Sequence, residues 1–150
     1  MLKRSEGYFR GKNDFELFFQ VWAPPKPDAT LVITHGLGEH TESYQRLVDG
    51  LSAHLNLRFV AWDLRGHGRS EGKRGVVQNF SDFSDDLEIF LKFVNKEMGQ
   101  EKTALLGHSM GSLVNMRALS EKGNMGLKCL AFSSPFLAVQ VAVPQIKKMG

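Results

Sequence analysis

Apolar positions fall along the chain in two kinds of pattern that alternate with each other. Residues 29–34 form a short continuous apolar run, which is typical of a strand covered on both faces, and residues 57–62 form a second strand-like run. Between them lie five apolar residues at helical spacing: Tyr44, Leu47, Val48, Leu51 and Leu55. A strand, a helix and a strand are therefore predicted in that order.

A longer helix is predicted at residues 80–98. Seven apolar residues form one stripe along it: Phe80, Phe83, Leu87, Phe90, Leu91, Val94 and Met98. Asn79 or Ser81 is expected to cap this helix, because short polar side chains accept hydrogen bonds from the first free N–H groups. The stripe predicts that one face of the helix packs on the core.

Three more elements follow the long helix: a strand at 103–106, a helix at 113–122 and a strand at 127–132. Ahead of the alternating region, residues 5–11 and 14–23 are predicted to form two strands joined by a turn. Alternation of strand and helix implies a mostly parallel sheet flanked by helices on both faces. The predicted fold class is therefore α/β.

Composition narrows the classes of protein further. The chain has 150 residues, of which 42% are hydrophobic, enough for one globular domain with a core. Its net charge is only +3 and no cluster of five basic residues occurs, so no nucleic-acid partner is expected. The first residues lack the apolar stretch of a secretory signal, and no run reaches the roughly 20 apolar residues of a membrane span. A cytoplasmic location is expected.

The chain contains a single cysteine, Cys129, within the apolar run at 127–132. It is expected to be a small buried apolar residue, and it excludes a disulfide within the chain. No C-x-x-C or H-E-x-x-H motif is present, so neither a metal nor another cofactor is expected.

Residues 107–111 read Gly-His-Ser-Met-Gly and fit the pattern G-x-S-x-G. In this pattern the serine sits on a tight turn between a strand and a helix with its hydroxyl exposed, and the sequence predicts both elements here. Small residues are needed on either side, here Gly107 and Gly111, because larger side chains would collide across the bend. The sequence thus predicts Ser109 as a catalytic nucleophile.

A second segment, residues 35–40, reads His-Gly-Leu-Gly-Glu-His and directly follows the first buried strand. Acyl transfer creates an oxyanion, which backbone N–H donors stabilise. One donor is the N–H after the nucleophile, that of Met110, and the other comes from the loop before the first helix. Leu37, which follows Gly36, is the best candidate for the second donor.

A third segment, residues 63–72, carries Asp63 and His67 among glycines and arginines. Both side chains precede the serine in the chain, whereas a triad acid and base usually follow it. A hydrogen-bonded structural loop is therefore expected, tied down by Arg65 and Arg69.

The other histidines give no clear catalytic base. His108 is expected to pack or to form a hydrogen bond, and His54 to be exposed or to cap the first helix, while for His40 a role at the oxyanion loop and a structural role are both open. After Ser109 the sequence contains no Asp and no His, and the only acidic residue is Glu121.

These three segments, in this order, resemble the corresponding blocks of the monoacylglycerol lipase and lysophospholipase group of α/β-hydrolases. The resemblance covers nearly the whole chain and is specific in combination. One departure is Ser112, which stands where the family often has a second glycine after the nucleophile.

The resemblance implies an eight-stranded α/β-hydrolase fold with a helical cap inserted after the sixth strand. Residues 127–132 would be that strand, residues 1–134 the N-terminal part of the core, and residues 135–150 the start of the cap or lid. The triad acid and histidine would follow the cap. The chain thus looks like the N-terminal half of such an enzyme, truncated after about the sixth strand, and would be inactive alone.

Two classes of function stay open at this point. One is a serine hydrolase that cleaves lipid-like monoesters, either monoacylglycerol or lysophospholipid, through an acyl-enzyme on Ser109. Peptidases and other esterases of the same fold share this turn. Its partner would be a small lipid ester, and any contact with a membrane surface would involve the cap. The other class is a non-catalytic binding module in which Ser109 lacks an activating base.

Overall fold

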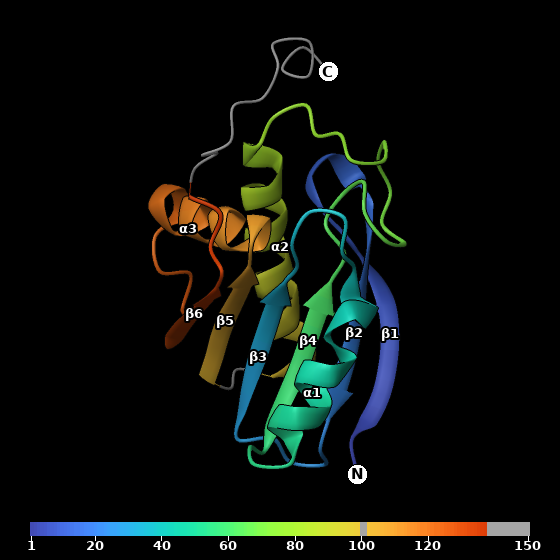
Figure 1. Ribbon diagram of the computed structural model, residues 1–150, viewed down its shortest axis with the longest axis vertical. Coiled ribbons are helices and arrows are strands. Elements are labelled where there is room, and N and C mark those ends of the chain that lie inside the picture. The colour runs from blue at the N-terminus through green and yellow to red at the C-terminus, as the bar shows by residue number, and fades with distance from the viewer. Residues whose placement is uncertain (100–101, 138–150) are drawn as a thin grey trace.

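The computed structural model describes residues 1–99 and 102–137, which form a six-stranded sheet with helices on both faces (Figure 1). The strands are β1 (Lys3–Arg10), β2 (Glu16–Ala23), β3 (Ala29–Thr34), β4 (Leu57–Trp62), β5 (Lys102–His108) and β6 (Cys129–Ser133). Their order across the sheet is β1-β2-β4-β3-β5-β6. β2 pairs antiparallel with β1 and β4, whereas β4, β3, β5 and β6 pair in parallel. The predicted α/β class and mostly parallel sheet are confirmed.

Helical segments connect the strands. They are η1 (Lys12–Asp14), η2 (Thr41–Tyr44), α1 (Gln45–Ser52), α2 (Ser81–Met98) and α3 (Met110–Lys122), of which η1 and η2 are 3-10 turns. Helix α1 lies on one face of the sheet, and α2 and α3 pack together on the other (Figure 1). Because β3, β4 and β5 run in parallel, the loops that follow them meet at one edge of the sheet.

The larger core lies between the sheet and the α2–α3 face. The stripe predicted on the long helix is buried there, and Phe90 of α2 packs its ring against Phe9 and Trp62 at centroid distances of 4.5 and 5.5 Å. On the opposite face, Val48 of α1 packs with Ile33 of β3. Burial on both faces explains the continuous apolar run of β3.

The predicted cap of α2 is wrong. Phe80 occupies the N-cap position in a helical conformation, and no side chain caps this helix end. Asn79 contributes only its backbone carbonyl, which accepts a hydrogen bond from the Asp82 N–H at 2.9 Å, and Ser81 is already the first helical residue. The aspartates of the first two turns bind basic side chains from elsewhere in the chain instead.

The expected burial of Cys129 is also wrong. Within the described residues β6 has a neighbouring strand on one side only, and all five of its residues are exposed, Cys129 among them. Of the segment expected to begin a cap, residues 135–150, only residues 135–137 lie inside the described part. No helix in the part described here is long and apolar enough to span a bilayer.

Candidate active site

Ser109 occupies a sharp turn between β5 and α3. Its backbone angles are φ 50° and ψ −118°, in a region that non-glycine residues rarely adopt. Helix α3 begins at Met110, three residues before the predicted start, because the chain passes from strand to helix within this single residue. The strand–turn–helix context required of the G-x-S-x-G pattern is therefore present.

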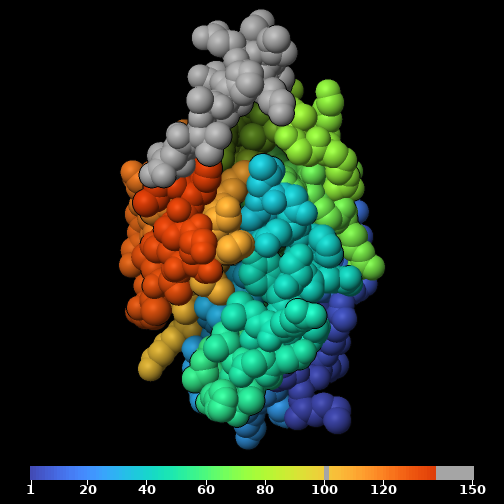
Figure 2. Space-filling model, viewed as in Figure 1, coloured from blue at the N-terminus to red at the C-terminus, as the bar shows by residue number. Residues whose placement is uncertain are grey.

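The turn is held by hydrogen bonds to both backbone groups of Ser109. Its N–H donates to the Ser133 carbonyl at 3.0 Å, and its carbonyl accepts from the Phe136 N–H at 3.2 Å and the Ser112 N–H at 3.0 Å. Figure 2 shows the orange-red segment that contains β6 beside the amber end of β5 and the cyan segment that follows β3. A strained residue persists only where its surroundings fix it, and these three bonds do so.

The two glycines of the motif are required for different reasons. A Cβ on Gly107 would lie 2.7 Å from the Ser112 Cα, so this residue must be small because of the bend itself, as the sequence predicts. A Cβ on Gly111 would overlap the backbone carbonyls of Thr34 and His35. Gly111 thus allows α3 to pack directly on the end of β3, which sequence reasoning did not anticipate.

Two polar residues of α3 stabilise the turn, and sequence reasoning missed both roles. The buried Ser112 hydroxyl donates to the Gly107 carbonyl at 2.7 Å, which gives a use for the serine at this position. The buried Asn115 amide, oriented to satisfy its neighbours, donates to Thr34 Oγ1 at 2.8 Å and accepts from the Gly107 N–H at 3.2 Å. Polar residues on the buried face of the predicted helix were the available signal.

The segment after β3 forms a tight turn against Ser109. The Glu39 N–H donates to the Gly36 carbonyl at 3.2 Å, and Gly38 in the turn has φ +76°, as a type II turn requires. A Cβ on Gly36 would lie 3.1 Å from the Ser109 Cβ, so a larger residue at position 36 would crowd the predicted nucleophile. Leu37, the other central residue, has a side chain that is 66% exposed.

The two N–H groups predicted as oxyanion donors remain available. Met110 is the first residue of α3, so its N–H has no acceptor within the helix. Neither this N–H nor that of Leu37 donates a hydrogen bond to any of the residues that the structure describes. The structure places both at the edge of the sheet where Ser109 lies.

Glu39 joins this turn to its neighbours. One carboxylate oxygen, Oε2, accepts from the Gly36 N–H and from the Tyr44 hydroxyl, each at 2.8 Å. Partial burial raises the pKa of Glu39, but these two hydrogen bonds outweigh it and hold the pKa below its ordinary value. The other oxygen, Oε1, lies 3.8 Å from His108 Nε2.

The ring of His108 faces β6. Its Nδ1 lies 3.1 Å from the Ser133 carbonyl and 3.2 Å from the Ser133 hydroxyl. This agrees with the hydrogen-bonding role predicted for His108. A cavity of about 320 Å³ opens beside it, lined by Glu39, Ser43, Tyr44, Leu47, Leu106, His108 and Ser133.

His35 connects the same turn to Leu64 through its ring, a role that sequence reasoning did not assign. Its Nε2 accepts from the Leu64 N–H at 2.9 Å, so the proton is on Nδ1, which donates to the Gly36 carbonyl at 2.7 Å. Burial lowers the pKa of His35 to about 4, so the ring is neutral at pH 7. Neither ring nitrogen is free to act as a base.

The loop at residues 63–72 is structural, as predicted. The buried Asp63 carboxylate accepts from the backbone N–H groups of Thr41 at 2.7 Å and Arg69 at 2.8 Å, and burial raises its pKa. His67 lies 3.1 Å, through Nδ1, from the Arg65 carbonyl. Within the described residues no hydrogen bond links Asp63 or His67 with Ser109.

Arg65 and Arg69 tie this loop down, again as predicted. Arg65 binds the fully buried Asp86 of α2 through Nε at 2.6 Å and Nη2 at 2.8 Å. The exposed Arg69 pairs with Glu6 of β1 at 3.0 Å. The first pair is two-pronged and buried, which makes it the stronger anchor.

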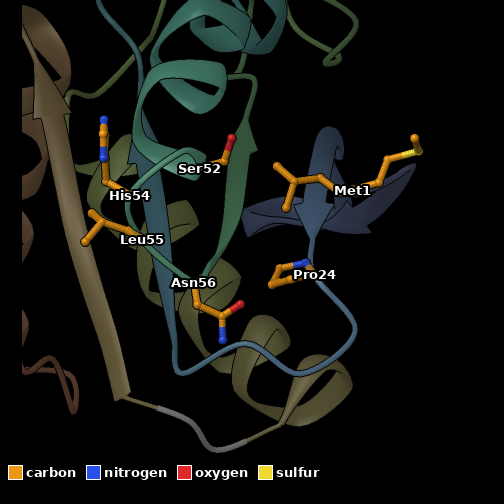
Figure 3. Close-up of a pocket in the computed structure, with 7 residues that line it drawn as sticks. Met1, Pro24, Ser52, His54, Leu55 and Asn56 are labelled. Carbon is orange, nitrogen blue, oxygen red and sulfur yellow. The ribbon is translucent and has the colours of Figure 1, made fainter.

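Among the described residues, His40 and His54 form no hydrogen bond with Ser109. His54 is exposed, as predicted, and His40 is exposed without capping η2 through its side chain. A hollow of about 420 Å³ near His54, lined also by Met1, Pro24 and Asn56, lies at the opposite edge of the sheet (Figure 3). Among the described residues no group of three metal-ligating side chains is close enough to hold an ion.

Comparisons with known proteins agree with this geometry. A family model described as "Serine aminopeptidase, S33" (Hydrolase_4) matches residues 25–150. Monoglyceride lipase of Rattus norvegicus is 38% identical over 107 residues, 71% of this chain and 35% of that protein. Phospholipase YtpA of Bacillus subtilis is 29% identical over 123 residues, 82% of this chain and 46% of that protein.

Solved structures show the same fold. A thermostable carboxyl esterase from Bacillus coagulans superposes with a TM-score of 0.75 at 21% identity, covering 88% of this chain and 44% of that one. The α/β-hydrolase GrgF from a Penicillium species superposes with a TM-score of 0.78 at 18% identity, over 89% and 46%. The chain therefore spans between about a third and a half of the length of the proteins that it matches.

Proposed function

The chain belongs to the serine aminopeptidase S33 family of α/β-hydrolases, and from this premise we propose that Ser109 is the nucleophile of an enzyme that cleaves carboxylic esters. The observation that carries the proposal is the strained backbone of Ser109 on the strand–helix turn, beside a glycine, Gly36, where a Cβ would lie 3.1 Å from the Ser109 Cβ. A hydrolase needs its serine on such a strand–helix turn, and strained backbone of this kind clusters at active sites.

In this proposal the Ser109 oxygen attacks the ester carbonyl carbon and transfers its proton to a general base. The N–H groups of Leu37 and Met110 stabilise the resulting oxyanion. Collapse of the tetrahedral intermediate breaks the ester bond, and the leaving alcohol takes up the proton from the base. Water then attacks the acyl-enzyme in the same way and releases the carboxylic acid.

The general base and its acid are proposed to come from outside the described residues. His35 uses both ring nitrogens in hydrogen bonds, and His108 is turned toward Ser133. No described histidine forms a hydrogen bond with the Ser109 hydroxyl within residues 1–99 and 102–137. Residues 1–134 would form the N-terminal part of the core, and residues 135–150 the beginning of a cap over the site.

Lipid-like monoesters, either monoacylglycerols or lysophospholipids, are the proposed substrates. The names of the relatives, monoglyceride lipase and phospholipase, support this class. Peptide hydrolysis is the second candidate, because the family description names an aminopeptidase.

A substrate panel on the full-length protein tests the proposal. The panel contains monooleoylglycerol, lysophosphatidylcholine and an aminoacyl p-nitroanilide. We expect ester hydrolysis that Ser109→Ala removes and that Ser5→Ala, at an exposed serine of β1, leaves intact. Cleavage of the anilide with no cleavage of either ester would replace the esterase proposal by the peptidase one, and equal rates for Ser109→Ala and the unmodified protein would refute both.

A further inference from the structure

Glu39 closes the turn after β3 with two hydrogen bonds. Its backbone N–H donates to the Gly36 carbonyl at 3.2 Å, and its carboxylate accepts from the Gly36 N–H at 2.8 Å. Both polar groups of the Gly36 backbone are thus bound by one residue, with Leu37 and Gly38 between them. Hydrogen bonds to an ionised acceptor are about twice as strong as neutral ones, so the carboxylate bond is the stronger of the two closures.

The carboxylate is itself fixed by a second donor. The Tyr44 hydroxyl donates to the same oxygen, Oε2, at 2.8 Å, and Tyr44, the last residue of η2, is buried in the core of the α1 face. Burial, and then the hydrogen bond to Glu39, raise the pKa of Tyr44, so the phenol keeps the proton that it donates. The turn is therefore anchored through Glu39 to the packed core.

The anchored turn lies beside the proposed nucleophile. A Cβ on Gly36 would lie 3.1 Å from the Ser109 Cβ, 3.2 Å from Glu39 Oε2 and 3.4 Å from His108 Cδ2. The turn that Glu39 fixes therefore leaves no room for a side chain between Gly36 and Ser109. A shift of this turn by a few tenths of an ångström would move the next N–H, that of Leu37, relative to the serine oxygen.

From these contacts, and resting on the hydrolase function proposed above, we propose that Glu39 is a positioning residue that holds the Leu37 N–H in place to bind the oxyanion. Glu39 does not itself take part in proton transfer. One of its oxygens is occupied by two donors, and the other lies 3.8 Å from His108 Nε2. What the reaction needs from Glu39 is an acceptor at the right distance from Gly36.

This requirement separates two conservative variants. Glu39→Gln keeps the length of the side chain and offers a carbonyl oxygen to both donors, while its NH₂ group can face His108. Glu39→Asp keeps the charge but is one methylene shorter, so it cannot reach the Gly36 N–H from the same backbone. If reach matters, the glutamine variant is the more active one.

The test is steady-state hydrolysis of p-nitrophenyl butyrate by the full-length protein. We expect Glu39→Asp to lower kcat by about 10- to 100-fold, less than the 10²- to 10³-fold loss on removing a donor outright, with KM within about twofold. Glu39→Gln should stay within about threefold of the unmodified protein. Glu42→Asp is the matched control, since Glu42 is an exposed acid of η2 paired with Arg4, and it should not change kcat.

Two results would overturn the positioning role: a kcat for Glu39→Asp equal to or above that for Glu39→Gln, or a change confined to KM. An amide NMR measurement reads the same bond without substrate. The Gly36 amide proton should move upfield in Glu39→Asp and much less in Glu39→Gln. An inactive unmodified protein would contradict the hydrolase proposal alone, and an unchanged Gly36 amide in Glu39→Asp would contradict the role of Glu39 alone.

Discussion

Replacing Asp86 by alanine should destabilise the fold by about 3–5 kcal/mol, the usual cost of breaking a buried ion pair. The Asp86 carboxylate has no exposed surface and accepts from Arg65 Nε at 2.6 Å, Arg65 Nη2 at 2.8 Å and the Lys12 N–H at 2.8 Å. Alanine would leave a guanidinium that is 6% exposed, and a backbone donor beside it, without their acceptor. Three segments, the β1–β2 turn, the 63–72 loop and α2, would lose their common anchor.

Asp85→Ala is the matched control, one position along the same helix. Asp85 also has two cationic partners, Lys12 and Lys122, but its side chain is 23% exposed and its pairs are solvated. Surface pairs contribute about 0–1 kcal/mol each. Urea unfolding followed by tryptophan fluorescence measures the free energy of unfolding of both variants. In a thermal melt, the melting temperature of Asp86→Ala should fall by about 6–20 °C, at 2–4 °C per kcal/mol. A loss below about 1 kcal/mol, or one equal to that of Asp85→Ala, would refute this assignment of the anchor.

Three further predictions follow from the site. Gly111→Ala should destabilise the protein by about 1–3 kcal/mol in thermal melting and slow ester hydrolysis, because its methyl group would overlap the Thr34 carbonyl; unchanged melting would contradict the close packing of α3 on β3. The pKa of His35 falls from 6.5 in the unfolded chain to about 4 in the fold, so the unfolded chain binds the extra proton, and stability should drop by about 3 kcal/mol as the pH falls from 6.5 to 4. Urea titrations across that range check this, and a His35→Gln variant that keeps the same pH slope would argue against it. Asn115→Ala should cost about 1–3 kcal/mol by removing the bridge between Gly107 and Thr34, whereas Asn124→Ala, at an exposed position after α3, should cost less than about 0.5 kcal/mol in the same urea titration.

The main strands and helices could be predicted because buried apolar residues follow patterns over only a few neighbouring positions in the sequence. The apolar run of β3 and the helically spaced apolar stripe of α2 are both local patterns, and both are buried in the structure. Ser109 could also be predicted as the nucleophile from the sequence, because the steric restriction at Gly107 and Ser109 arises within a bend of only a few residues.

What could not be predicted depends on contacts between distant segments. Asn79 and Ser81 do not cap α2, and the polar residues of its first two turns that bind other segments are Asp82 and Asp86, whose partners Lys12 and Arg65 lie 70 and 21 residues away along the chain. The exposure of Cys129 depends on which strand forms the edge of the described sheet, and a continuous apolar run does not reveal that.

The polar residues around Ser109 are a second example. Asn115 of α3 bridges the ends of β3 and β5, and His35 joins the turn after β3 to Leu64 in the loop after β4, so both roles appear only once these strands lie side by side. Local sequence patterns report which residues face the core, whereas hydrogen bonds between loops require the register of the sheet.

The most direct test of the central claim is covalent labelling of the full-length protein with a fluorophosphonate, followed by peptide mass spectrometry. A serine activated for acyl transfer attacks phosphorus and displaces fluoride, while an ordinary serine hydroxyl does not react. We expect one adduct, on Ser109, together with loss of ester hydrolysis in proportion to labelling. An active enzyme that carries its adduct on another residue, or that keeps its activity when Ser109 is modified, would contradict the central claim.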